Sequence, residues 1–230
     1  MLVPILVYER GIFFASTPLA KFKKHYFFVC TECHEVSLKT TKEDLVKRQV
    51  SAQDLEEMGK DKRFLYYFTL GHGYHRISGG EPLLTKEAER LLRFAIEEDP
   101  ENPMPYNSLS VLYINAGQPG MALKWAGKAK ERARSKNERA LFLSNLATAY
   151  GERKQYKKAV ECLEEAIEED PVAGYHYELG SFYMEVWEYR KAISAFEYFL
   201  LYREAGDKMI FSEGDTGAAI AICKSRVGEA

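Results

Sequence analysis

The chain of 230 residues has few cysteines and prolines, little net charge and no long apolar run. It contains four cysteines and eight prolines, and its formal net charge is −2. Four cysteines in a chain of this length do not form the disulfide framework of a small secreted protein. Nearly balanced charge excludes a global field that attracts nucleic acid. The apolar start is short and meets Glu9 and Arg10, so we expect neither a signal peptide nor a membrane span, but a cytoplasmic protein.

The sequence also lacks the local motifs of common enzyme sites. It has no glycine-rich phosphate loop, no HExxH and no Gly-x-Ser-x-Gly motif. Gly71-His72-Gly73 lies inside an aromatic helical pattern and follows no buried strand. The acidic clusters at residues 97–99 and 168–170 are typical of solvated helix ends. We therefore expect a protein that is not an enzyme.

What the sequence does contain is an internal repeat. The hexapeptide Ala-Ile-Glu-Glu-Asp-Pro occurs at residues 95–100 and again 71 residues later, at residues 166–171. This offset is about two ~34-residue helix-turn-helix units plus a few inserted residues. The clearest unit, residues 140–172, predicts two amphipathic helices that end at Pro171, because its apolar residues recur every three or four positions. These residues are Leu143, Leu146, Ala147, Tyr150, Ala159, Leu163 and Ala166.

This spacing closely resembles the tetratricopeptide repeat (TPR) family. A second copy contains Leu179, Gly180, Tyr183, Ala192 and Phe196. A third contains Tyr106, Leu109, Ser110, Tyr113, Ala122, Ala126 and Ala129, and we expect the basic residues 128–139 to lengthen its second helix or its exit loop. A fourth contains Tyr67, Leu70, Gly71, Tyr74, Ala88, Leu92, Ala95 and Pro100, with an enlarged turn at Gly79, Gly80 and Pro82.

The predicted fold class is therefore α+β and mainly α, a TPR-type helical-hairpin solenoid with a small N-terminal β module. We expect the β module in residues 1–40, a linker helix in 41–63, about four repeats in 64–205, and a loop with a C-terminal capping helix in 206–230. The loop should extend to Gly217. The capping helix should cover the end of the stack through Ala218, Ile220, Ala221, Ile222 and Val227.

Residues 1–40 contain three apolar runs that predict short strands, followed by the pair Cys30 and Cys33. Such a pair can supply two thiolates to Zn²⁺. The stretch resembles the second half of a bacterial zinc-ribbon module, but the preceding CxxC pair of that family is absent. The remaining ligands would come from His25 or His34, from His72 and His75, or from a segment upstream of Met1. Cys162 and Cys223 are expected to be small core residues.

Stacked helical hairpins leave a concave surface that binds peptides or helices. The TPR resemblance therefore implies a non-catalytic interaction scaffold with a protein or peptide partner. The alternatives are that this surface is merely solvated, or that the chain is a zinc-ribbon-type metal- or nucleic-acid-binding regulator. The predicted groove residues are mostly uncharged: Phe68, His72, His75, Asn107, Val111, Asn115, Ser144, Asn145, Thr148, Tyr177, Ser181 and Met184.

The carboxylate clamp that some TPR proteins use for a ligand's C-terminus is absent, because only Asn145 matches it. We therefore do not expect an acidic C-terminal tail in this groove. Glu152, Glu178 and Glu185 instead favour neutral or basic partners at one end.

Two further surfaces are candidates for contact with other molecules. The basic residues 128–139 lack interleaved aromatic residues, so we expect them to suit a helix C-terminus rather than nucleic acid. An aromatic set near the C-terminal end is a candidate homodimer surface if part of it is exposed. The set comprises Trp187, Tyr189, Tyr198, Phe199, Tyr202 and Phe211.

Overall fold

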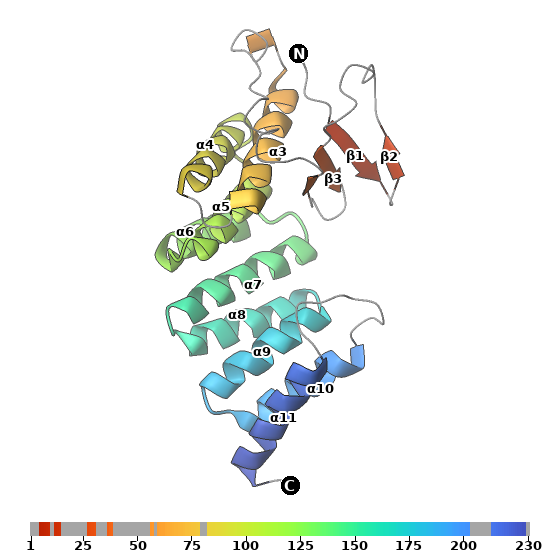
Figure 1. Ribbon diagram of the computed structural model, residues 1–230, viewed down its shortest axis with the longest axis vertical. Helices are drawn as coiled ribbons and strands as arrows, with labels where there is room; N and C mark the ends of the chain where they lie inside the picture. Colours follow the sequence, from red (N-terminus) through yellow and green to blue (C-terminus); the bar gives the residue numbers. More distant parts are fainter. Residues whose placement is uncertain are drawn as a thin grey trace. The chain divides into compact units, whose positions relative to one another are not determined.

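The structure, a computed structural model, describes residues 5–9, 12–14, 27–30, 36–38, 56–57, 59–78, 82–202 and 213–228. For the strands and for residues 76–78 and 213–214 it describes the backbone alone. The chain forms two compact units, Met1–Ala116 and Gly117–Ala230. Where side chains are described, each unit is all-α, with helices α3 to α5 in unit 1 and α6 to α11 in unit 2 (Figure 1).

Unit 1 begins with four short strands, β1 Ile5–Glu9, β2 Ile12–Phe14, β3 Phe27–Cys30 and β4 Val36–Leu38. Backbone pairing gives the order β2-β1-β3-β4. The pair β1–β2 is antiparallel, β1–β3 is parallel and β3–β4 is antiparallel. A zinc-ribbon half module is defined by its side chains, so that part of the fold stays a prediction.

The helices of unit 1 are α3 Lys60–Ser78, α4 Pro82–Glu98 and α5 Pro103–Asn115. The expected hairpin of α3 and α4 is present, and the helices approach closely at Gly71, where an added Cβ would lie 2.9 Å from Leu92 Cγ. The predicted enlarged turn is wrong. Because α3 continues to Ser78 and α4 starts at Pro82, the extra residues lengthen both helices, and only residues 79–81 connect them.

Unit 2 contains α6 Pro119–Glu131, α7 Lys136–Glu152, α8 Tyr156–Glu169, α9 Ala173–Glu185, α10 Tyr189–Tyr202 and α11 Glu213–Val227. In Figure 1, α7 to α10 lie side by side, and successive helices run in opposite directions. The small residues Ala147, Ala159, Ala166 and Ala192 are fully buried, as the repeat pattern predicts. Their size lets the helix axes approach closely.

Contrary to expectation, the basic residues 128–139 lengthen neither α6 nor the loop that follows it. Helix α6 ends at Glu131, and α7 starts after four connecting residues. Ser135 caps α7 by accepting a hydrogen bond from the Glu138 N–H at 3.1 Å, and the Glu138 carboxylate accepts one from the Arg134 N–H at 2.7 Å. This capping arrangement starts α7 early, so the added length belongs to the first helix of the next hairpin.

Helix α11 packs on the core that includes α9 and α10, through a face that shares only Ile220 and Val227 with the predicted one. Thr216 and Cys223 are fully buried, and Ala219, Ile220 and Val227 are partly buried around them. Ala218, Ala221 and Ile222 are exposed. The helix starts at Glu213, before the predicted end of the loop at Gly217. In the part of the chain that is described, no helix has both the length and the apolar character needed to cross a membrane.

Candidate partner-binding surfaces

The first surface, here called the α7–α9 face, carries Ser144, Asn145 and Thr148 on α7 and Glu178, Ser181 and Met184 on α9. Ser144 is buried, and its Oγ donates a hydrogen bond to Glu178 Oε2 at 3.1 Å. This bond joins the first helices of two successive hairpins. First helices line the concave side of a helical-hairpin array, so this face is the part of unit 2 where the predicted groove lies.

Glu178 is the acidic residue of this face, and its pKa is strongly shifted. Burial raises the pKa of its carboxyl to about 7, and the hydrogen bond from Ser144 opposes that rise. Nearby, burial, followed by the charges of Asp170 and Glu178, raises the pKa of Tyr175 to about 12. A carboxylate removed from water is stabilised by any cation or hydrogen-bond donor that reaches it. Glu178 can therefore accept a donor group from a bound molecule.

The hydroxyl groups of this face bond to their own helices. Thr148 Oγ1 donates to Ser144 O, and Ser181 Oγ donates to Tyr177 O, both at 3.1 Å. The predicted groove residue Tyr177 instead packs edge-on against α10, with ring centroids 5.5 Å from Phe196 and 5.3 Å from Phe199. Sequence spacing places Tyr177 on the right helix but does not show that its ring turns toward α10.

Two of the groove residues predicted on α3, His72 and His75, contact polar side chains of α5. His72 Nδ1 lies 3.3 Å from Ser108 Oγ, and His75 Nε2 lies 3.0 Å from Asn115 Nδ2, so both pairs join α3 to α5. The side chains of Phe68, His75 and Asn107 are buried, and Val111 is half-buried. Such contacts suit histidines with a packing role.

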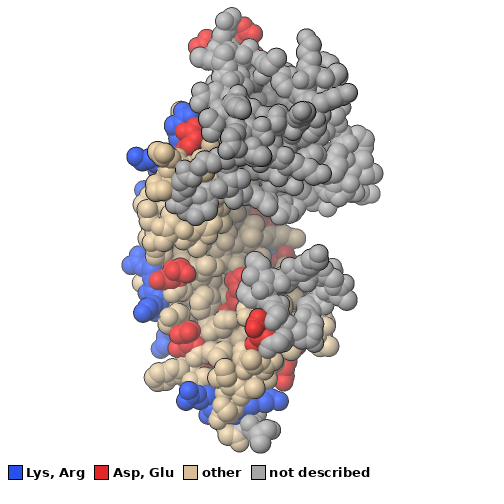
Figure 2. All heavy atoms as spheres, viewed as in Figure 1, with Lys and Arg blue, Asp and Glu red and all other residues tan. Residues whose placement is uncertain are grey.

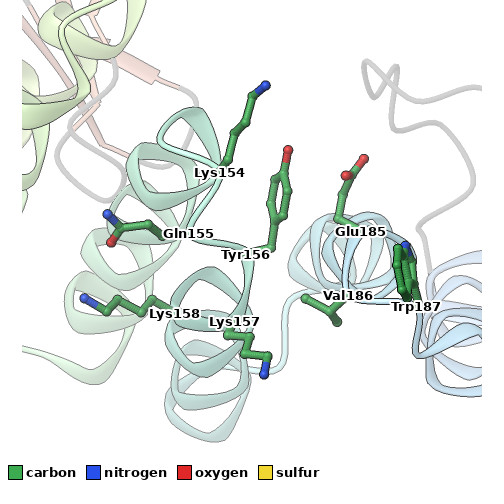
Figure 3. A pocket seen from close by; sticks show the side chains of 8 residues that line it. All are labelled: Lys154, Gln155, Tyr156, Lys157, Lys158, Glu185, Val186 and Trp187. Atoms are coloured by element: carbon green, nitrogen blue, oxygen red, sulfur yellow. The ribbon is translucent and has the colours of Figure 1, made fainter.

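The second surface is a pocket of about 560 Å³ between the α7–α8 turn and the α9–α10 turn, here called the turn pocket. It was not predicted from the sequence. Figure 3 shows its lining side chains, which come from the start of α8 on one side and the end of α9 on the other. They are Lys154, Gln155, Tyr156, Lys157, Lys158, Glu185, Val186 and Trp187. In Figure 2, Lys and Arg side chains lie along the left edge of the view, the side on which the α7–α8 turn lies in Figure 1.

Two lining residues have an unusual backbone conformation. Lys154 has φ 58° and Trp187 has φ 65°, and they are the two non-glycine residues with positive φ in the described ranges. Both follow the C-cap of a first helix. Gly117, with φ 65°, occupies the same position after α5. This conformation favours glycine. Glycine is therefore the residue expected two positions after the helix, and a tryptophan at residue 187 departs from that expectation.

The predicted aromatic set does not form one surface. Phe199 is fully buried, Tyr189 is half-buried, and Tyr198 stacks on His176 with ring centroids 3.8 Å apart. Trp187 and Tyr202 are 79% and 58% exposed, but they lie at opposite ends of α10, about 20 Å apart by the helical rise. Phe211 lies outside the described residues.

The predicted basic stretch makes local contacts. Lys130 Nζ lies 2.8 Å from Glu165 Oε1, Arg139 Nε lies 3.3 Å from Glu169 Oε1, and Lys128 Nζ lies 4.8 Å from the centre of the Trp125 ring. These partners lie on α6 and α8. The ion pairs link neighbouring helices. Lys128 and Lys130 also lie in the last turn of α6, where the helix-end interpretation expects basic residues, whereas Arg139 lies near the start of α7.

The zinc prediction stays a prediction. Cys30 is the last residue of β3, and Cys33, His25 and His34 lie outside the described residues. Within the described ranges, no three His, Cys, Asp or Glu side chains gather in a way that suits a metal ion. Zinc content per purified chain, compared with a Cys30→Ser, Cys33→Ser variant, tests the prediction.

The remaining two cysteines have the packing role that the sequence predicts. Cys223 is fully buried, and Cys162 packs on the cores of both neighbouring hairpins. Burial raises the pKa of the Cys162 thiol to about 11. A thiol with so high a pKa is a poor nucleophile near neutral pH.

Comparison with known proteins supports the repeat assignment. Residues 140–171 match the sequence model of the tetratricopeptide repeat. No curated protein matches the chain. Among solved structures, a crystal structure of the MamA protein is 21% identical over 73% of this chain and 84% of that chain, with a TM-score of 0.58. The Cut9–Hcn1 hetero-tetramer of the APC/C is 18% identical over 70% of this chain and 29% of that chain, also with a TM-score of 0.58.

At these identities the similarity shows the fold alone, a helical-hairpin array that contains a tetratricopeptide repeat. This fold agrees with the expectation of an interaction scaffold that is not an enzyme.

Proposed function

We propose that the protein is a non-catalytic scaffold that binds a basic peptide segment or helix of a partner protein on the α7–α9 face. The observation that carries the proposal is the half-buried carboxyl of Glu178, which bridges two successive first helices through Ser144. A carboxyl group at this place, with its pKa raised to about 7 by burial, costs stability whenever it is ionised. A cation from a partner offsets that cost.

The surroundings of Glu178 favour the same partner. Glu152 and Glu185 are exposed at the ends of α7 and α9, so they add negative charge at one end of the face. Thr148 and Ser181 retain acceptor lone pairs, because each hydroxyl proton is donated within its own helix. Met184 is half-buried and can contact apolar atoms of a bound segment. The partner segment should therefore combine a Lys or Arg with uncharged residues.

The test is binding of a fluorescein-labelled peptide with two arginines spaced for one helical turn, followed by anisotropy at pH 6 and pH 8. The ionised fraction of a carboxyl with pKa about 7 rises about tenfold over this interval. Affinity should rise by about the same factor, because the apparent dissociation constant scales with the population of the competent state.

Glu178→Gln should weaken binding at pH 8 and remove the pH dependence. Glu161→Gln, at an exposed position on α8, is the matched control and should behave like the wild type. Binding that is equally strong for the Glu178→Gln variant, or stronger for a peptide with glutamates in place of the arginines, would contradict the proposal.

A further inference from the structure

Two residues of the turn pocket have a backbone conformation that glycine adopts more readily than other residues. Trp187 is 79% exposed and holds a left-handed backbone conformation. Lys154, across the pocket, has the same conformation. Gly117 fills the equivalent position after α5 without a side chain. The backbone conformation closes each first helix, because the N–H groups of Gln155 and Glu188 donate to Tyr150 O and Tyr183 O at 2.9 Å. Helix closure does not require an exposed aromatic side chain at this position, where glycine suffices.

The side chains of the pocket combine apolar surface with positive charge. Tyr156, Val186 and Trp187 supply its apolar lining. In Figure 3 the Tyr156 ring stands beside Glu185, and Trp187 lies on the other side of α9 in this view. Lys154 and Lys157 are exposed, and Lys158 lies 5.5 Å above the ring of Tyr150.

The acidic groups nearby do not balance these lysines. Glu185 is the acidic residue of the lining. Beside the pocket, Glu188 pairs with Lys191 at 2.6 Å. Three lysines against one glutamate leave the lining net positive, in a chain whose net charge is negative.

From this combination we propose that the turn pocket is a second binding site, which takes a short acidic segment of a partner protein with one aromatic side chain as its anchor. The anchor lies between Tyr156, Val186 and Trp187, and the flanking carboxylates pair with Lys154 and Lys157. A volume of about 560 Å³ accommodates such an anchor with part of its flanking chain. The site borders the α7–α9 face at Glu185 and has the opposite charge preference.

A labelled peptide of sequence Gly-Asp-Glu-Phe-Asp-Glu-Gly tests the proposal with the full chain. Anisotropy measures affinity, and tryptophan emission reports the location, since Trp125 is buried and Trp187 is exposed. We expect a blue shift and weaker acrylamide quenching of Trp187 on binding. A peptide with lysines in place of the acids should bind at least tenfold more weakly. Affinity of the acidic peptide should fall as salt rises.

Variants separate a binding role from a structural one. Trp187→Gly and Lys157→Glu should each weaken the acidic peptide at least tenfold. Lys124→Glu, at an exposed position on α6, is the matched control and should leave affinity unchanged. Trp187→Gly should keep or raise the melting temperature, because glycine suits the backbone at this position.

Several results would overturn the proposal. One is the absence of binding by the acidic peptide at concentrations up to about 1 mM, and another is equal affinity for the basic peptide. A Trp187→Gly variant that melts at a lower temperature but binds the acidic peptide unchanged would also contradict it. Light scattering that shows a wild-type dimer dissociated by Trp187→Gly would also overturn it, because a second copy would then be the occupant.

Discussion

Two regions near α9 differ in how well their residues fit the fold. One is the interior between α9 and α10, and the other is the turn pocket at the end of α9. In the interior, Gly180 leaves room for the ring of Phe196, and Ala192 lets the helices approach. Each residue there has the size that packing requires. At the turn, Trp187 is exposed where a glycine would fit better. Interior residues hold the array together, and the difference agrees with the proposal that the turn residues contact a partner.

The largest effect should follow from removing the interior ring. Phe196 is 1% exposed and contacts Tyr177 edge-on. Phe196→Ala should lower the free energy of unfolding by about 3–5 kcal/mol, because it removes buried apolar surface and leaves a cavity. Urea denaturation followed by circular dichroism measures the change. A loss below about 1 kcal/mol would mean that the α9–α10 interior is not tightly packed.

A smaller substitution in the same interior, Gly180→Ala, tests how closely α9 and α10 approach. An added Cβ at Gly180 would lie 2.7 Å from the Phe196 ring, so Gly180→Ala should destabilise by about 1–3 kcal/mol. Gly127→Ala on α6 is the matched control, because a Cβ there meets nothing within 4 Å. That control should stabilise by about 0.5–1 kcal/mol, as alanine favours a helix interior. Equal effects of the two variants in thermal melts would contradict the close approach.

The α7–α9 face should respond to pH. Burial places the pKa of folded Glu178 at about 7, above the ordinary value of 4.5, so the folded state binds the proton more tightly. Stability should therefore fall as pH rises from about 4.5 to 7, and the penalty should persist above pH 7. Because Glu178 is only half-buried, Glu178→Gln should gain on the order of 1–2 kcal/mol at pH 8.

At pH 4, below the ordinary pKa of 4.5, the gain from Glu178→Gln should nearly disappear. Urea titrations of both proteins at the two pH values measure the difference. A gain that is the same at pH 4 and pH 8 would show that the carboxyl does not titrate in this interval.

The smallest change in stability should come from Trp187→Gly, and it should be a gain where the interior variants Phe196→Ala and Gly180→Ala cause a loss. Trp187→Gly relieves the left-handed strain at φ 65° but gives the unfolded chain more freedom, so stability should change by about +0.5 kcal/mol or less. Differential scanning calorimetry resolves such a change. A loss comparable with that of Gly180→Ala would place Trp187 among the residues that hold the array and would remove the contrast between the two regions.

The repeat pattern predicts the hairpins because the same positions recur at the contacts between helices. Leu163 and Phe196, both predicted, are fully or almost fully buried. The pattern does not determine how inserted residues are used, and so it missed the long α3 and α4 and the early start of α11. It reports which helix a residue belongs to, but not the rotamer that turns Tyr177 toward α10.

The repeat pattern did not predict the turn pocket for a related reason. It forms from residues of two successive turns, and the repeat template describes helix contacts within hairpins. A comparison of the positions after each first helix, Gly117, Lys154 and Trp187, shows the departure from glycine in the sequence itself. Even so, sequence alone does not show that Lys154 and Trp187 line one pocket.

The most direct test of the scaffold function is photo-crosslinking in the native cell with benzoylphenylalanine at Ser181 or at Ser194. Both serines donate to a carbonyl of their own helix, but Ser181 lies on the α7–α9 face and Ser194 is exposed on α10. The account predicts a discrete crosslink at residue 181, to a partner segment rich in Lys or Arg, that Glu178→Lys abolishes. A crosslink at residue 194 with none at 181, or an acidic segment bound at 181, would contradict it.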